Sequence, residues 1–464
     1  MEKKLRQKKA DNGFVTGTFE RYSYVLYFFG QLLFYSLVTG FLQLFLTDSG
    51  IPATTVGIIF AVAKVWDAIN DPLFGAVVDK TRLKKGRYIP WVRLSGLLIP
   101  VTTVLIFLMP SGASMQVKIV WAAAAYMLWD TSYTFNDVPI FALATAMTEN
   151  MRERDWLFLV RGYTTFAGII VAGLAIPLLY PNIGWAATAI VISVFAMITM
   201  LPVGYAAKER NASDENNEPT LGELARYFVK NKYLLIVNGA AIVASLTNTG
   251  AAVGSYVAIY CYGGVEFIAL VAIVAAIPAL LSIVIVQQIV KKIDKITVVN
   301  VCRVIGIALS IITYFVGYSR PAVNLGLIFI ASFLTGGAGA LGPLFTADCA
   351  EYGHFKTGSR AQGIAFSVQT FTAKMTAALS AAIGMIVLGL VGFVEGAGAV
   401  QTPETIAWLW KLNTLVPLIG GVLSFLLFLF TYKLKTTDVD LMAQANRGEL
   451  SREEAMAGFS RQYT

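Results

Sequence analysis

Acidic side chains inside apolar stretches are the residues of this sequence best suited to chemistry. Within the apolar run 54–78, a lysine, an asparagine and two aspartates recur at helical spacing: Lys64, Asp67, Asn70 and Asp71. On a helix, Asp67 and Asp71 stack on one face with Asn70 beside them, and Lys64 lies one turn before Asp67. Two close carboxylates cannot both stay ionised without a positive charge between them, so this spot suits a hard monovalent cation or a shared proton. The alternative is an ion pair with Lys64 that only holds helices together.

A second apolar run, 117–145, repeats the pattern. Asp130 and Asp137 are seven residues apart, on one face of a helix and about 10 Å apart along its axis. If the two runs meet as helices, Thr134 and Asp137 complete an oxygen cage with the acidic face of the run 54–78. A complete cage favours Na⁺, although a proton would satisfy the same carboxylates.

Aromatic side chains follow the acidic face of the run 117–145. Trp129, Tyr133 and Phe141 are spaced so that a ring can stack on the apolar face of a pyranose. Each ring taken alone is more often used for helix packing or for an aromatic belt at the membrane surface.

Two basic residues complete the set of candidates. Lys374 is the lone charge well inside the apolar run 362–392, and a buried lysine needs a carboxylate partner, which the first half of the chain has in surplus. The alternative is a lysine that extends to the membrane surface. Arg161 lies early in the run 157–181 and is compatible with a position facing a cavity or facing the cytoplasmic surface.

These residues belong to a chain whose composition is that of a membrane protein. Of its 464 residues, 56% are hydrophobic and 14% are charged, against about 45–50% and roughly 25% in soluble domains. Apolar runs of about 20 residues recur, each long enough to cross a hydrocarbon core of about 30 Å. We expect an all-α membrane protein with twelve spans, roughly at 23–46, 54–78, 91–110, 117–145, 157–181, 183–206, 234–261, 264–290, 298–318, 322–347, 362–392 and 408–433.

Basic residues between the spans indicate topology rather than a nucleic-acid partner. The clusters, such as Lys291 to Lys295, all fall on one side of the expected membrane, so both termini are expected to be cytoplasmic. The predicted domains are an N-tail (1–22), a six-helix half (23–206), a cytoplasmic linker (207–233), a second six-helix half (234–433) and a C-tail (434–464).

The motifs of several other protein classes are missing from the sequence. It has no HExxH and no nucleophile with a spaced base, and its single histidine, His354, lies in an expected loop, so a membrane hydrolase is not expected. It has no GxxxxGK[ST] loop of an ATP-driven pump. The cysteines Cys261, Cys302 and Cys349 lack the spacing of a disulfide framework or a zinc site.

The charged runs resemble the signature of a known family. Three groups of residues carry the resemblance: Trp66 to Pro72 with Gly75, Asp79, Thr81, Arg82, Gly86, Arg87, Pro90 and Trp91; Tyr133, Thr134, Asp137, Val138 and Pro139 with Arg152, Glu153 and Arg154; and Ala347, Asp348, Glu351, Tyr352 and Gly353 with Val368, Gln369, Thr370 and Lys374. In these residues the chain is similar to the glycoside-pentoside-hexuronide:cation symporters of the major facilitator superfamily, over nearly its whole length.

The resemblance implies a major facilitator fold with a site for each of two ligands. It places the coupling cation on Asp67, Asn70, Asp71, Thr134 and Asp137. It places the sugar against Asp137 and Arg161 with Lys374 near both ligands, and further candidate sugar contacts are Gln31, Trp129, Asp130, Tyr133, Phe141 and Thr370. It assigns cytoplasmic gating to the segment Asp79 to Arg87 and to the loop Asp348 to Arg360, with the candidates Asp79, Arg82, Arg87, Asp348 and Glu351.

Three positions depart from the family pattern. Gln31 stands in the first span where a sugar-binding aspartate is known in the family, and Phe141 stands where a stacking tryptophan is known. Asp130 stands where a glycine is usual. We hypothesise that Asp130 replaces the missing acceptor of the first span.

The expected function is secondary active transport across the cytoplasmic membrane. A sugar (a glycoside, pentoside or hexuronide) would be carried with Na⁺, H⁺ or Li⁺ by alternating access of the two halves. Two other functions stay open: a carrier of lysophospholipids or other amphipathic solutes, and a non-transporting sugar sensor. The expected partners are a small-molecule sugar, a monovalent cation and membrane lipid, with no cofactor and no nucleic acid, and a monomer is expected to be functional.

Overall fold

The computed structural model describes residues 14–80, 86–210, 228–358 and 362–463. Within these ranges the backbone forms helices and no β-strand. The chain divides into two compact units, one comprising Met1–Asn216 with Val394–Val400 and the other comprising Asn217–Phe393 with Gln401–Thr464. Each unit is therefore described by itself.

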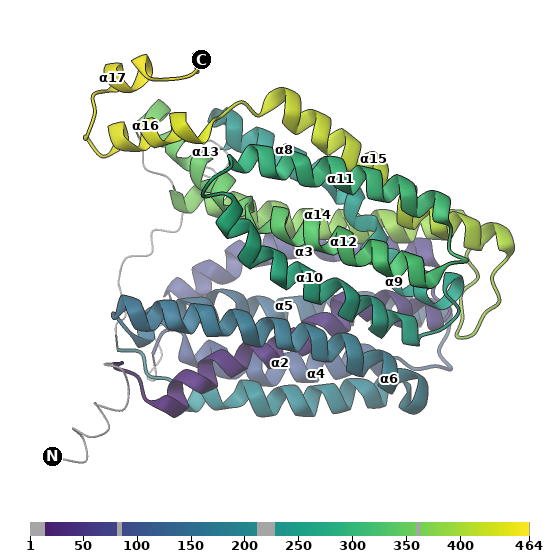
Figure 1. Ribbon diagram of the computed structural model, residues 1–464. Helices are drawn as coiled ribbons and strands as arrows, with labels where there is room; N and C mark the ends of the chain where they lie inside the picture. Colours follow the sequence, from purple (N-terminus) through teal and green to yellow (C-terminus); the bar gives the residue numbers. More distant parts are fainter. Residues whose placement is uncertain (1–13, 81–85, 211–227, 359–361, 464) are drawn as a thin grey trace. The chain divides into compact units, whose positions relative to one another are not determined.

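Unit 1 is a bundle of long apolar helices (Figure 1). Its elements are α2 (Thr18–Asp48), α3 (Ala53–Lys80), α4 (Ile89–Phe107), α5 (Met115–Met147) and α6 (Met151–Ala206). Helix α2 packs along α6, α4 packs against both α5 and α6, and α3 packs against α5. The pairing of α3 with α5 brings the two acidic runs of the sequence together.

Unit 2 contains the remaining helices. They are α8 (Lys232–Ala244), η1 (Ser245–Asn248), α9 (Thr249–Tyr256), η2 (Val257–Cys261), α10 (Glu266–Ile289), α11 (Lys295–Val316), α12 (Pro321–Ala340), α13 (Gly342–Thr357), α14 (Gln362–Leu390), α15 (Pro403–Thr431), α16 (Thr436–Asn446) and α17 (Arg452–Ala457). Helix α10 packs on α12, α11 on α15, and α16 on α13.

Nine helices in the described part of the chain are long and apolar enough to cross a membrane. The longest, α6, is one of the nine, although its backbone departs from helical geometry at Gly184, where φ is 80°. Glycine occupies positive φ without the steric penalty of a Cβ atom, so this position divides α6 into two helical pieces. The twelve spans, the predicted domain boundaries and the cytoplasmic location of the termini stay predictions.

Two glycines set the close packing of α2 on α6. A Cβ atom at Gly30 would lie 2.7 Å from the carbonyl oxygen of Ala196, and a Cβ atom at Gly168 would lie 2.7 Å from the carbonyl oxygen of Phe29. Both distances are shorter than a van der Waals contact, so only glycine allows the two backbones to approach this closely. Helix α2 is therefore held close to α6 on both sides of Gly184.

Two expected elements differ from the structure. The prediction of a loop from Asp348 to Arg360 is wrong, because helix α13 continues to Thr357. This helix has a proline in its first turn and ends at Gly358, whose backbone is in the left-handed region. The span expected at 234–261 contains a 3₁₀ turn and a π-helical turn. The C-tail contains two short helices, α16 and α17.

Candidate functional site

A lysine held by two aspartates lies inside unit 1. The Lys64 ammonium, on α3, is 3.3 Å from the carboxylate of Asp67 on the same helix and 3.6 Å from the carboxylate of Asp130 on α5. The side chains are 23%, 9% and 7% exposed, respectively. Because the surroundings are apolar, the attraction between these charges is screened far less than at a surface. With both carboxylates ionised, the charges of these three side chains sum to −1.

Two hydrogen bonds join α3 to α5 beside this lysine. The indole of Trp66 donates to the hydroxyl of Thr131 at 2.8 Å, and the amide of Asn70 donates to the hydroxyl of Thr134 at 2.9 Å. The two runs therefore meet, as the predicted oxygen cage requires. Thr134 also donates to the backbone carbonyl of Asp130 at 3.1 Å, which holds its hydroxyl oxygen toward Asn70.

The structure brings together part of the predicted cation site. Asp67, Asn70 and Thr134 are buried neighbours across α3 and α5. Asp137 is half-buried one turn after Thr134 on α5. The side chain of Asp71 lies outside the described residues, so its share in the cage stays a prediction.

Lys64 and Asp130 have roles that the sequence analysis did not assign together. It gave an ion pair with Lys64 that holds helices together as the alternative to a cation site, without naming Asp130 as the partner, and it treated Asp130 as a substitute sugar acceptor. The ion pair between them crosses from α3 to α5, and the signal for it was present: a lysine and an unusual aspartate, each one turn from the predicted cage on helices expected to touch.

Helix α2 also contacts α5 through polar and aromatic side chains. The amide nitrogen of Gln31 donates to the hydroxyl of Tyr133 at 3.0 Å. Trp129 stacks on Tyr133 with the ring centroids 5.1 Å apart, but it is only 2% exposed and its indole donates to Thr103 at 2.9 Å. Trp129 is therefore packed in the core, as the alternative interpretation of the aromatic residues expected, while Tyr133 carries the hydroxyl at this face.

Arg161 on α6 is enclosed by aromatic rings. The centre of its guanidinium is 5.0 Å from the Phe28 ring, 4.5 Å from the Phe141 ring and 5.4 Å from the Phe158 ring. The rings come from α2, α5 and α6, respectively, and Phe141 is 42% exposed. Arg161 lies ten residues after the start of α6, about 15 Å along its axis, so it is not at the end of the helix.

The candidates of the second half lie in unit 2. Lys374 is half-buried on α14, and its expected pairing with carboxylates of the first half stays a prediction. Thr370 is exposed, and its hydroxyl donates to the carbonyl of Phe366 at 3.1 Å.

The gating candidate Asp348 forms a buried ion pair with Lys295, which joins α13 to the start of α11. The sequence analysis counted Lys295 among the basic residues that indicate topology and so missed this contact. Glu351, one turn after Asp348, accepts a hydrogen bond from Asn446 of α16 at 2.8 Å. The C-tail therefore packs on the helix that contains both gating candidates.

The C-tail is held through one buried carboxylate. Asp438 accepts hydrogen bonds from the backbone and the hydroxyl of Ser460, at 3.0 Å and 2.6 Å, and from the hydroxyl of Tyr463. Burial alone would raise the pKa of Asp438, but the hydrogen bonds outweigh it and lower the pKa below its ordinary value. The ionised carboxylate therefore stabilises the folded tail.

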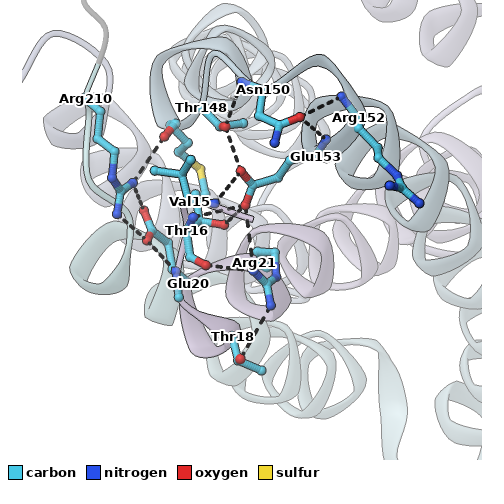
Figure 2. Close-up of polar contacts among 12 residues, drawn as sticks. Val15, Thr16, Thr18, Glu20, Arg21, Thr148, Asn150, Arg152, Glu153 and Arg210 are labelled. Atoms are coloured by element: carbon cyan, nitrogen blue, oxygen red, sulfur yellow. Dashed lines mark hydrogen bonds and ion pairs between the residues drawn. The ribbon is translucent and has the colours of Figure 1, made fainter. Parts of the chain in front are cut away.

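A polar cluster closes the end of unit 1 at which α2 and α6 begin (Figure 2). Glu153 is fully buried and accepts hydrogen bonds from the backbone amides of Val15 and Thr16, both at 3.0 Å, and from the hydroxyl of Thr148 at 2.7 Å. Arg21 lies 3.7 Å from the same carboxylate. The residues before α2 are thus fastened to the turn between α5 and α6.

The residues that follow α6 bind the same end. Arg210 forms two hydrogen bonds to the Glu20 carboxylate, at 2.8 Å and 2.9 Å (Figure 2). Glu209 accepts from three successive backbone amides at the start of α4, those of Arg87, Tyr88 and Ile89, at 2.7 to 2.8 Å.

The gating candidate Arg87 lies in this cluster through its backbone. Arg82 and the side chain of Asp79 lie outside the described residues. The gating role of all three stays a prediction.

The comparisons with known proteins bear on the whole chain. Residues 23–436 match the protein family described as MFS/sugar transport protein. The chain belongs to this family. The match begins in the second turn of α2 and runs to the first residue of α16, so it spans both units.

Similar proteins in bacteria are transporters of comparable length. The uncharacterised symporter YjmB of Bacillus subtilis (strain 168) is 28% identical over 89% of this chain and 92% of that protein. The isoprimeverose transporter of Lactiplantibacillus pentosus is 27% identical over 94% and 93%, and the glucuronide carrier protein homolog of Escherichia coli (strain K12) is 26% identical over 84% and 87%.

Solved structures share the fold at low identity. The nucleoside transporter NupG superposes with a TM-score of 0.61 at 12% identity, over 90% of this chain and 100% of that chain. A bacterial homolog of the human lysosomal transporter Spinster gives a TM-score of 0.62 at 13% identity, over 94% and 99%. The chain is a multi-pass membrane protein with an all-helical fold of the major facilitator type, and the family to which it belongs consists of transporters rather than enzymes.

Proposed function

We propose that the protein is a symporter of the cytoplasmic membrane that couples the uptake of a sugar to a monovalent cation, Na⁺ or H⁺. The observation that carries the proposal is the lysine held by two aspartates on α3 and α5, with Asn70 and Thr134 beside it. A charge at the centre of a membrane span costs about 2.5–3.5 kcal/mol on insertion scales. A transporter has a use for such charges, whereas a helix bundle that only needs to pack does not.

The net charge of −1 on Lys64, Asp67 and Asp130 gives the group a place for one more positive charge. A bound Na⁺ or proton would neutralise it, and the hydroxyl and amide oxygens of Thr134 and Asn70 are ligands of the kind that a hard cation prefers. Lys64 would then keep the two aspartates close enough to share the cation, because it offsets their mutual repulsion.

The sugar side of the proposal rests on the face formed by α2 and α5 and on the relatives. Gln31 and Tyr133 offer an amide and a hydroxyl, and Phe141 offers an exposed ring, which are groups that bind the hydroxyls and the apolar face of a sugar. Several relatives bear the names of sugar carriers, among them the isoprimeverose transporter and the raffinose carrier protein of Pediococcus pentosaceus. If the cation organises this face, each ligand raises the affinity for the other by the same factor.

The test is uptake of labelled sugars into membrane vesicles with an imposed Na⁺ gradient or an imposed H⁺ gradient. We expect one gradient to drive accumulation of a sugar. We expect Asp67→Asn to abolish this accumulation but to retain part of the passive flux of sugar down the concentration gradient of the sugar itself. Glu404→Gln, at an exposed carboxylate in the first turn of α15, is the matched control and should transport as the unmodified protein does. If neither gradient drives accumulation of a sugar, or if Asp67→Asn leaves accumulation intact, the proposal is refuted.

A further inference from the structure

A guanidinium without a carboxylate lies inside unit 1. Among the residues that the structure describes, Arg161 forms no ion pair, and its buried Nε atom has no hydrogen-bond partner. The other cation inside this unit, Lys64, has two carboxylates for one charge. Unit 1 therefore does not lack acidic residues, but none of the acidic side chains that the structure describes forms an ion pair with Arg161.

The aromatic rings hold Arg161 without neutralising it. Phe28, Phe141 and Phe158 attract the guanidinium through their π faces, which fixes its position at 4.5 to 5.4 Å from the ring centres. A cation in such a place keeps its hydrogen-bond donors available to a ligand, because the rings have no acceptor oxygen. The guanidinium is therefore preorganised for an anion.

Two further polar atoms without a partner lie on the helix face next to it. Tyr24, Phe28 and Gln31 follow one another at spacings of four and three residues, so they share one face of α2. The hydroxyl of Tyr24 and the side-chain oxygen of Gln31 are both buried and have no hydrogen-bond partner among the described residues. The Tyr24 ring contacts Phe28, and Phe28 contacts Arg161.

Unpartnered buried polar groups are rare in folded proteins, so the two on this face of α2, together with the Nε atom of Arg161 on α6, call for a ligand that satisfies them. Tyr24 is 0% exposed and Gln31 is 4% exposed, which excludes bulk water as the ordinary partner. The set offers donors of a charged fork at Arg161, a hydroxyl at Tyr24 and an acceptor at Gln31. It matches a small molecule with one anionic group and several hydroxyls.

We infer that the substrate is an acidic sugar, a uronate, whose carboxylate pairs with Arg161 while its hydroxyls bond to Gln31 and Tyr24. This inference rests on the proposed sugar transport. A guanidinium binds a carboxylate through two parallel hydrogen bonds, and one fork matches one carboxylate. A neutral sugar would leave the charge of Arg161 without compensation. Gln31 is uncharged, so it does not repel an acidic substrate.

The decisive comparison is between a uronate and its uncharged amide. Binding of D-glucuronate, D-galacturonate and D-glucuronamide to the purified full-length protein is measured by titration calorimetry. We expect a uronate to bind about 10- to 100-fold more tightly than the amide, the range for a charge-assisted hydrogen-bond pair. Equal binding of uronate and amide would overturn the inference.

Variants of Arg161 locate the effect. Arg161→Gln should remove the preference for the charged sugar, and Arg161→Lys should retain part of it because the charge remains. Arg320→Gln, at an exposed arginine before α12, is the matched control and should leave the preference unchanged. If Arg161→Gln retains the full preference, the inference fails; if that variant does not fold, the uronate and amide comparison on the unmodified protein decides alone.

Uptake under a gradient separates this inference from the proposed function. Accumulation of a uronate but not of its amide supports both. Accumulation of a neutral sugar with no preference for a uronate supports the symport and overturns the acidic substrate. Preferential binding of a uronate that no gradient accumulates overturns the symport and supports the acidic substrate, and the absence of any binding or uptake overturns both.

Discussion

Replacing Lys64 by methionine tests whether its two carboxylates depend on it. The change keeps an unbranched, flexible side chain that is one atom shorter, and it removes the charge that lies 3.3 Å from Asp67 and 3.6 Å from Asp130. The two aspartates then share an apolar site without a cation, and one of them must take up a proton or repel the other. We expect Lys64→Met to be less stable than the unmodified protein, and the double variant Lys64→Met with Asp130→Asn to recover most of the loss.

The magnitude follows from the burial of the group. Removing one partner of a fully buried ion pair costs about 3–5 kcal/mol. Lys64 is 23% exposed, so some solvent reaches it and we expect about 2–4 kcal/mol. With an unfolding entropy of about 2.1 cal/mol/K per residue, 464 residues give about 1 kcal/mol/K, so the loss lowers the unfolding temperature by about 2–4 °C.

Thermal unfolding of the four proteins in one detergent measures the effect as a double-mutant cycle. The four are the unmodified protein, the two single variants and the double variant. Unfolding temperatures are compared at one heating rate, because membrane proteins unfold irreversibly. If the effects of Lys64→Met and Asp130→Asn simply add, the two side chains do not interact and the reasoning is refuted.

Three other changes test the remaining contacts. Thr134→Val removes the hydroxyl that accepts from Asn70 and should raise the cation concentration for half-maximal uptake about 5- to 10-fold, while Thr134→Ser should not; an unchanged cation dependence of uptake by Thr134→Val would place that hydroxyl outside the cation site. Asp438→Asn should lower the unfolding temperature by about 1–3 °C at about pH 7. The pKa of Asp438 is lower in the folded protein than in the unfolded chain. The difference in unfolding temperature should therefore be fully present above the ordinary carboxyl pKa of 3.8 and should be lost as the pH falls through the lowered pKa of the folded protein. A difference that does not depend on pH would contradict this expectation. Gly30→Ala should reduce the yield of monodisperse protein in gel filtration, whereas Gly40→Ala, which meets no neighbouring atom, should not; equal yields would show that α2 does not need its close approach to α6.

Features that repeat with the helical period were predictable from the sequence. The apolar runs predicted the long helices, and the spacing within 54–78 and 117–145 put Asn70 and Thr134 on faces that can meet. The contact itself needed one further fact, that the two runs are neighbours in the bundle. The matching residues of the related family supplied that expectation.

Contacts between distant residues were not predictable, because no period relates their positions. The partner of Asp348 is Lys295, 53 residues earlier, which looked like one more basic residue beside a span. The isolation of Arg161 is a property of the folded unit rather than of its sequence, since several aspartates precede it in the chain and none of those whose side chains the structure describes forms an ion pair with it. Proline within an apolar run does not show where a helix begins or ends. Pro343 lies in the first turn of α13, and this helix continues to Thr357 through residues that were expected to form a loop.

The ion pair between Glu20 and Arg210 has a consequence for biosynthesis. The two residues are 190 positions apart, so at about 5–20 residues per second the ribosome adds Arg210 about 10–40 s after Glu20. During that interval α2 is already made, but α6, along which it packs through Gly30, is incomplete. Helix α2 is therefore synthesised before the helix along which it packs. Until Arg210 has been added, the Glu20 carboxylate lacks this partner and must be solvated by water or by the insertion machinery.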